Sequence, residues 1–204
     1  MDWTWASLVE GFAAAGAWYV DVVEVVGDRW GSPGLGEWDV RSLVGHTSRS
    51  FVTVETYLAS PAEVVEIATS VDYYRATRSI AAGPGVAERG VAAGLALGED
   101  PVAAVRELAD RVIPLVSSLT GSELVTTIAG GMRLADYLPT RIVELVVHTG
   151  DLCRALGVPV AVPELPARQA LSLVSGLAAV DGVAGDVLLA LTGRSSLPDG
   201  FSVM

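Results

Sequence analysis

Hydrophobic residues recur every three or four positions along most of this chain, which is the spacing of helices that bury one face. The pattern predicts long helices over residues 3–26, 38–59, 101–119, 136–156 and 166–191. Gly157 follows the fourth of these at the position where many helices end, and Pro159 lies just beyond it. Long helices joined by loops predict a mostly α helix bundle.

The segment after residue 59 is predicted to be helical in two shorter stretches. Ser60 fits the position before a helix, with Pro61 at the first helical position and Glu63 at the third. The predicted stretches cover residues 62–80 and 85–97, with a break at Gly83-Pro84-Gly85. These stretches add extra helices to the bundle.

Three other segments are predicted to be non-helical. Residues 27–36 are rich in glycine and proline, which predicts a loop. Residues 124–134 hold four β-branched residues followed by Gly130-Gly131, which predicts one short β-hairpin. Residues 194–204 predict an irregular tail, so we expect one helix-bundle domain over residues 1–193 followed by this tail.

The composition is that of a compact, acidic globular protein. Of the 204 residues 51% are hydrophobic and 18% are charged, which excludes a disordered chain. The formal charge of 13 − 24 = −11 opposes binding to nucleic acid or to anionic membranes. The apolar stretch Leu171–Leu191 is interrupted by Asp181 and Asp186, which predicts a buried helix and not a membrane span. A non-cationic start and a single cysteine, Cys153, predict a cytoplasmic protein.

The chain has only two histidines, and both fall on amphipathic helices. Glu144 and His148 are four positions apart, so their side chains leave the same face of the 136–156 helix. Asp151 extends this polar stripe along the edge of the apolar face. His46 lies at the corresponding edge of the 38–59 helix, on the flank of Ser50, Thr53 and Tyr57. If the apolar faces of the two helices pack together, these edges meet.

Two imidazoles and one carboxylate are a ligand set for a divalent metal with open coordination positions. His46, Glu144 and His148 are therefore the candidate ligands, and Asp151 is a candidate for orienting a ligand or relaying a proton. The alternative is a solvated helix surface with His46 as a hydrogen-bonded core residue. Arg141 could pair with Glu144 and tune the site.

Several other residues have both a structural and a functional interpretation. Cys153 is interpreted as a buried, unreactive thiol and not as a nucleophile. The five tryptophans are interpreted as packing residues, although some could rim the site. Tyr73-Tyr74-Arg75 and Arg78 favour a solvated helix face over a cationic wall for an acidic substrate or thiol carboxylate.

Two segments resemble a known family. Residues 38–46 are similar to its Trp-x-Val-Arg-(Asp)-Leu-Val-Gly-His signature. Residues 137–152 are similar to its Arg-x-x-Glu-x-x-x-His-x-x-Asp-Leu signature. The chain resembles, over most of residues 3–192, the N-terminal domain of the mycothiol-dependent maleylpyruvate isomerases, which belongs to the wider DinB-like metal-binding four-helix bundles.

The resemblance implies a function as well as a fold. It implies that His46, Glu144 and His148 bind a metal, most often zinc, and that Asp151 has a supporting catalytic role. It implies mycothiol as a low-molecular-weight thiol that reacts, as a thiolate, with a small electrophile. The expected activity is that of a metal- and thiol-dependent transferase or isomerase.

The chain departs from the family in two respects. Gly150 replaces a bulky aromatic residue, which could open the pocket. We also expect no second catalytic domain, so maleylpyruvate isomerisation itself is not implied. A metal-dependent hydrolase at the same site stays open as an alternative. So does a non-catalytic metal-binding or sensing bundle, with a possible homodimer through an apolar helix face.

Overall fold

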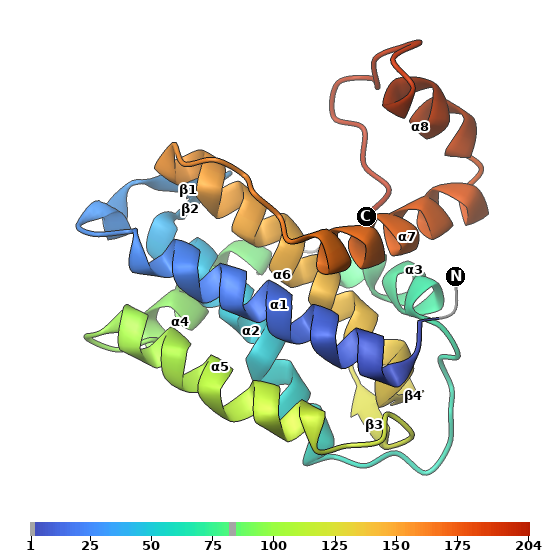
Figure 1. Cartoon of the computed structure of the whole chain (residues 1–204), viewed down its shortest axis with the longest axis horizontal. Helices are drawn as coiled ribbons and strands as arrows, with labels where there is room; N and C mark the ends of the chain where they lie inside the picture. The colour runs from blue at the N-terminus through green and yellow to red at the C-terminus, as the bar shows by residue number, and fades with distance from the viewer. Residues whose placement is uncertain (1–2, 82–84) are drawn as a thin grey trace.

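The computed structural model describes residues 3–81 and 85–204 (Figure 1). These residues form a mostly α, DinB-like helix bundle, as predicted, with two small antiparallel sheets. The helices are α1 (Trp5–Glu24), α2 (Val40–Leu58), α3 (Ser70–Ala81), α4 (Val86–Ala96), α5 (Pro101–Ser117), α6 (Leu134–Leu156), α7 (Glu164–Val180) and α8 (Ala184–Leu191). Gly83 and Pro84 of the predicted break lie outside the described residues.

Helices α1, α2, α5 and α6 form the centre of the bundle and bury their apolar faces against one another. Phe12 of α1 meets Phe51 of α2 edge-on, with ring centroids 5.6 Å apart. The fully buried Tyr19 donates a hydrogen bond to the carbonyl of Val44 over 2.6 Å. Helix α1 is long and apolar enough to cross a membrane, but its apolar face is used inside the bundle.

Helix α4 lies almost directly on the backbone of α2. A Cβ atom added to Gly45 would lie 2.1 Å from the backbone nitrogen of Gly94, so neither position leaves room for a side chain. One turn earlier, Gly90 of α4 packs against Trp38, whose indole nitrogen donates to the carbonyl of Ala87 over 3.0 Å. These contacts hold Trp38 beside the start of α2.

The described residues form two hairpins, whereas the sequence predicts one. The predicted hairpin over residues 124–134 is confirmed as β3 (Leu124–Thr127) paired antiparallel with β4 (Gly130–Arg133). The segment predicted as a loop over 27–36 instead contains a 3-10 turn and strand β1 (Pro33–Leu35), which pairs with β2 (Trp38–Asp39).

The prediction of a helix beginning at residue 62 is wrong. Residues 61–69 are irregular, with several bends, and lie along the β3–β4 hairpin, where Ala62 N–H donates to Leu124 O and Glu66 N–H donates to Gly131 O. Hydrogen bonds to the hairpin satisfy this backbone in place of a helix that Ser60 and Pro61 would begin.

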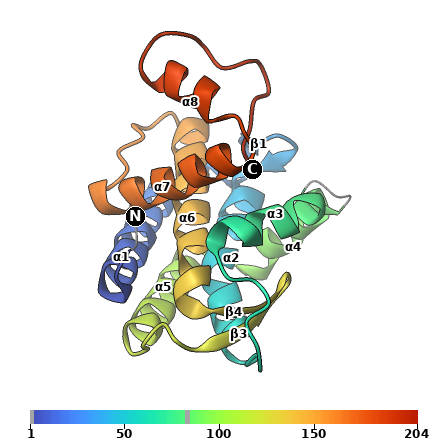
Figure 2. The ribbon, with the colours of Figure 1, turned by 90° about the vertical axis from the view of Figure 1, so that its right-hand side faces the viewer.

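The predicted helix over 166–191 is two helices. Asp181, Gly182 and Val183 separate α7 from α8, and Gly182 has a φ of 76°, in the left-handed region where a helix ends. Figure 2 shows α8 projecting from the bundle and the irregular tail returning toward it. The tail ends with Val203 buried, and its carbonyl accepts a hydrogen bond from Arg78.

Candidate metal centre

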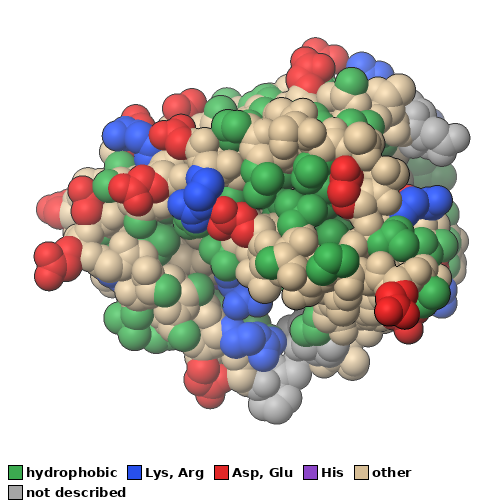
Figure 3. Space-filling model, turned by 90° about the horizontal axis from the view of Figure 1, so that it is seen from below, with side chains coloured by type: hydrophobic (Ala, Val, Ile, Leu, Met, Phe, Trp, Pro, Cys, Tyr) green, Lys and Arg blue, Asp and Glu red, His purple; other side chains and the backbone are tan. Residues whose placement is uncertain are grey.

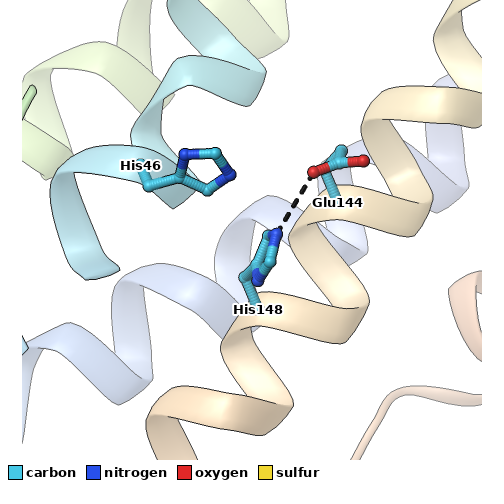
Figure 4. A group of neighbouring side chains, drawn as sticks. All are labelled: His46, Glu144 and His148. Carbon is cyan, nitrogen blue, oxygen red and sulfur yellow. Dashed lines mark ion pairs between the residues drawn. The ribbon is translucent and has the colours of Figure 1, made fainter. Parts of the chain in front are cut away.

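Helices α2 and α6 bring the three predicted ligands together (Figure 4). One ligand atom from each of His46, Glu144 and His148 lies within 4.8 Å of the other two. The side chains are 16% exposed for His148 and 18% exposed for Glu144, so a small ion can reach them. The two histidines are far apart in the sequence, but the packing of α2 on α6 brings them together.

The local sequence explains why these side chains share one face. Ile142, Leu145 and Leu152 are fully buried and anchor α6, which leaves the adjoining stripe at the surface of a cavity. On α2, the predicted flank also faces this cavity, and Thr53 accepts a hydrogen bond from Tyr137. Amphipathic phase on two packed helices is therefore sufficient to assemble the site.

His148 is held through both ring nitrogens. Its Nε2 lies 3.2 Å from Oε2 of Glu144, and its Nδ1 lies 3.2 Å from Oδ2 of Asp151. Burial alone would lower the pKa of His148, but its hydrogen bonds to Asp151 and Glu144 raise that pKa to about 9. Without a metal, His148 is therefore protonated at neutral pH, and its Nε2–H points toward Oε2 of Glu144.

Tyr74 fixes the other oxygen of Glu144. The hydroxyl of Tyr74 lies 2.8 Å from Oε1 of Glu144 and donates to it. Burial would raise the pKa of Glu144, but the hydrogen bond from His148 and the charge of Arg141 lower it to about 2. Glu144 is thus a carboxylate across the physiological pH range. The sequence pattern does not predict this contact, because the hydroxyl of Tyr74 reaches Glu144 from a different helix, α3.

His46 is held as a neutral imidazole. Burial and the neighbouring His148 lower its pKa to about 4. Its ring packs against Trp38, with centroids 4.5 Å apart, and meets the ring of His148 edge-on. Nδ1 of His46 is buried and has no hydrogen-bond partner among the described residues. A neutral imidazole keeps a lone pair available for a metal.

The three residues line a cavity of about 410 Å³ that is rich in arginine. Arg49, Arg78, Arg89 and Arg141 border it, whereas Glu144 is the one carboxylate among its lining residues. Arg141 does not form the ion pair with Glu144 that the sequence suggested. Its guanidinium lies over Tyr137, 4.9 Å from the ring centre, and its Nε donates to Thr140.

The interpretation of residues 73–78 as a solvated face is wrong for the tyrosines. Tyr73 and Tyr74 are buried and line the cavity. Arg75 and Arg78 are exposed and pair with Asp181 at the end of α7. Met204 of the tail also lines this cavity, so the tail contributes to its wall.

Apart from Trp38, the remaining candidate residues do not line the metal cavity. Of the five tryptophans, Trp38 lines it. Cys153 is fully buried, and burial raises its pKa, as expected for an unreactive thiol. Gly150 does not open the pocket, because a side chain there would point toward Val160.

The donor set fits a divalent metal. One carboxylate and two imidazoles match the ligands that zinc takes in sites with open positions. Asp151 completes a carboxylate–histidine pair of the kind that orients metal ligands. The charged Glu144 and neutral His46 are already in the protonation states that metal binding requires.

Comparison with known protein families matches residues 12–153 to the mycothiol maleylpyruvate isomerase N-terminal domain. No curated protein and no solved structure matches the chain. The matched region covers more than half of the sequence and contains His46, Glu144, His148 and Asp151. The chain therefore belongs to the mycothiol maleylpyruvate isomerase N-terminal domain family.

Proposed function

We propose that this protein is a metal- and thiol-dependent enzyme. His46, Glu144 and His148 hold one divalent ion, zinc, and a low-molecular-weight thiol, mycothiol, reacts there with a small electrophile. The proposal rests on the convergence of these three side chains, from two helices, at one cavity. The family match supports the choice of thiol.

A zinc ion held by such a set keeps a coordinated thiol as a thiolate at neutral pH. The chain's own residues prepare the site for this chemistry. Oδ2 of Asp151 accepts a hydrogen bond from Nδ1 of His148, which turns Nε2 toward Glu144. Tyr74 donates a hydrogen bond to Oε1 of Glu144, so that Oε2 faces His148. We assign Asp151 this positioning role together with a supporting catalytic role as a proton relay.

The arginines support an electrophile that carries an acidic group. Arg49 and Arg141 border the cavity, and neither forms an ion pair with a described carboxylate. Arg141 is 8% exposed, so its charge is largely removed from water and favours an anion close by. The chain has a net charge of −11, so this group of arginines makes the cavity locally positive in an otherwise acidic protein.

The proposal is tested with cobalt-substituted protein. Addition of mycothiol is expected to produce a sulfur-to-metal charge-transfer band, and His148→Ala is expected to lose both the metal and the band. A holoprotein that shows no such band with excess thiol contradicts the thiol-dependent function and favours metal-dependent hydrolysis. Loss of the free thiol on addition of a reactive electrophile then measures turnover directly.

We also propose that the enzyme works in the cytoplasm. A thiol-dependent reaction needs a compartment in which small thiols stay reduced, and the chain's one cysteine is buried as a free thiol. The homodimer stays a prediction, to be measured by light scattering of the purified holoprotein.

A further inference from the structure

A second cavity, of about 490 Å³, lies among α2, α4 and α5. It shares Arg49 and Arg89 with the metal cavity, so the two cavities are neighbours on either side of these arginines. The metal ligands do not line it. Figure 3 views the molecule from below, the side of α4 and α5 in Figure 1, where hydrophobic side chains gather among scattered charged ones.

Small residues on α4 create this cavity. The contact between Gly45 and Gly94 draws α4 onto α2, and the face of α4 that turns toward α5 carries Ala92, Ala93 and Ala96. These methyl groups leave the space between α4 and α5 unfilled. Leu108 of α5 supplies a further apolar wall. The volume lies in the range of sites that bind small molecules.

Two arginines at this cavity, Arg111 and Arg49, differ in their partners. Arg111, at one end, is held by both oxygens of Glu55, over 2.5 and 3.0 Å, and the nearby Glu107 adds to the negative charge beside it. Arg49 is half-buried and has no ion pair or side-chain hydrogen bond with any other described residue. A guanidinium offers five N–H donors in a planar fork that matches a carboxylate or sulfonate.

We propose that this second cavity binds a small amphiphilic acid. The acidic group lies on Arg49, and the apolar body, roughly the size of a medium-chain acyl group, lies on the alanines of α4. The apolar walls of this site come from α4 and α5 and not from α6, so its ligand would lie apart from the metal ligands, although the two cavities share Arg49.

Octanoate is the probe, and isothermal titration calorimetry of the zinc-supplemented full chain is the measurement. Wild type is expected to bind one octanoate per chain, and octan-1-ol and octylamine at least tenfold more weakly. Arg49→Gln is expected to bind octanoate at least tenfold more weakly than wild type does. A wild type that does not bind millimolar octanoate, or that binds octan-1-ol equally well, overturns the proposal.

Substitutions on α4 locate the site. Ala96 is exposed at the cavity, so Ala96→Trp fills the space without disturbing the core, and it is expected to abolish octanoate binding. Leu95→Trp is the matched control, because Leu95 is 68% exposed on the same helix and does not line the cavity. If circular dichroism shows that Ala96→Trp is unfolded, Ala92→Met, one turn earlier, replaces it.

His148→Ala separates this proposal from the metal-dependent function. It is expected to lose the metal and to retain octanoate binding. Octanoate binding that survives Ala96→Trp but is lost in His148→Ala places the ligand at the metal centre and overturns the second site.

Discussion

The carboxylate of Asp151 lies 3.2 Å from Nδ1 of His148 and holds the imidazole so that Nε2 is turned toward Glu144. The two residues are three positions apart on α6, so one turn of helix fixes the geometry. An imidazole whose outer nitrogen donates to a carboxylate is a better-oriented and more basic metal ligand. The proposed metal centre therefore depends on Asp151 as well as on its three ligands.

Asp151→Asn tests this dependence. The substitution keeps the shape of the side chain and removes its charge, so we expect the zinc affinity to fall by about 10- to 100-fold. Competition with a chromophoric chelator measures the change. Asp186→Asn, at an exposed position on α8, serves as a control and should bind zinc as wild type does. Equal affinities for wild type and Asp151→Asn would show that the contact does not support the site.

Tyr74→Phe tests whether the hydrogen bond from Tyr74 to Glu144 supports metal binding. Removal of the hydroxyl leaves Oε1 of Glu144 without its donor. We expect zinc affinity to fall about tenfold, while the free energy of unfolding of the metal-free protein changes by only about 1 kcal/mol. Zinc titration and urea unfolding separate these effects. A large loss of stability with unchanged zinc affinity would assign Tyr74 to packing alone.

The two histidines predict how the stability of the metal-free protein varies with pH. The pKa of His148 is raised from 6.5 to about 9, so its stabilising contribution is complete below pH 6.5 and is lost as pH rises toward 9. The pKa of His46 is lowered from 6.5 to about 4, so its contribution is complete above pH 6.5 and is lost as pH falls toward 4.

The contribution of these histidines is therefore greatest near pH 6.5, as urea unfolding at several pH values would show. His148→Gln is expected to remove the decline on the alkaline side. An unchanged decline in that variant would assign it to other groups.

Zinc binding is predicted to release protons. Near pH 7 the ring of His148 carries a proton that zinc must displace, whereas His46 is already neutral. Zinc affinity should rise about tenfold per pH unit between pH 6 and 8. Calorimetry in buffers of different ionisation enthalpy should show the release of about one proton. A zinc affinity that does not change over this range would contradict the pairing of His148 with Glu144.

The contact between α2 and α4 predicts a sensitive glycine. A methyl group at Gly45 would collide with the backbone at Gly94, so Gly45→Ala should lower the free energy of unfolding by about 2 kcal/mol or more. Gly185→Ala is the control, because no atom lies within 4 Å of the added methyl group and α8 gains a better helix former. Equal stabilities of the two variants would mean that α4 adjusts freely on α2.

The periodicity of the sequence was sufficient to predict the central helices and to place Glu144, His148 and Asp151 on one edge of α6. Helix phase is a local property, and amphipathic faces pack where they are strongest. The edge position of His46 on α2 made it a candidate ligand, but phase alone could not show that α2 packs on α6, and the resemblance carried by two short segments joined His46 to the site.

Features that depend on contacts between distant segments were not predictable in this way. Hydrogen bonds to the hairpin hold residues 61–69 in an irregular path, although Ser60 and Pro61 locally favour a helix. The apolar pattern continues on both sides of Asp181 within residues 166–191, but the left-handed Gly182 ends α7. Tyr74 reaches Glu144 only because α3 packs on α6.

The most direct test of the central claim is zinc titration of the metal-free wild type and of His46→Ala. His46 comes from a different helix than Glu144 and His148, so a site shared by the two helices must need it. We predict one zinc ion per chain with a submicromolar dissociation constant for wild type, and an affinity at least 100-fold lower for a folded His46→Ala. A wild type that binds no zinc at micromolar concentration, or a His46→Ala variant that binds it equally tightly, would contradict the proposed metal centre.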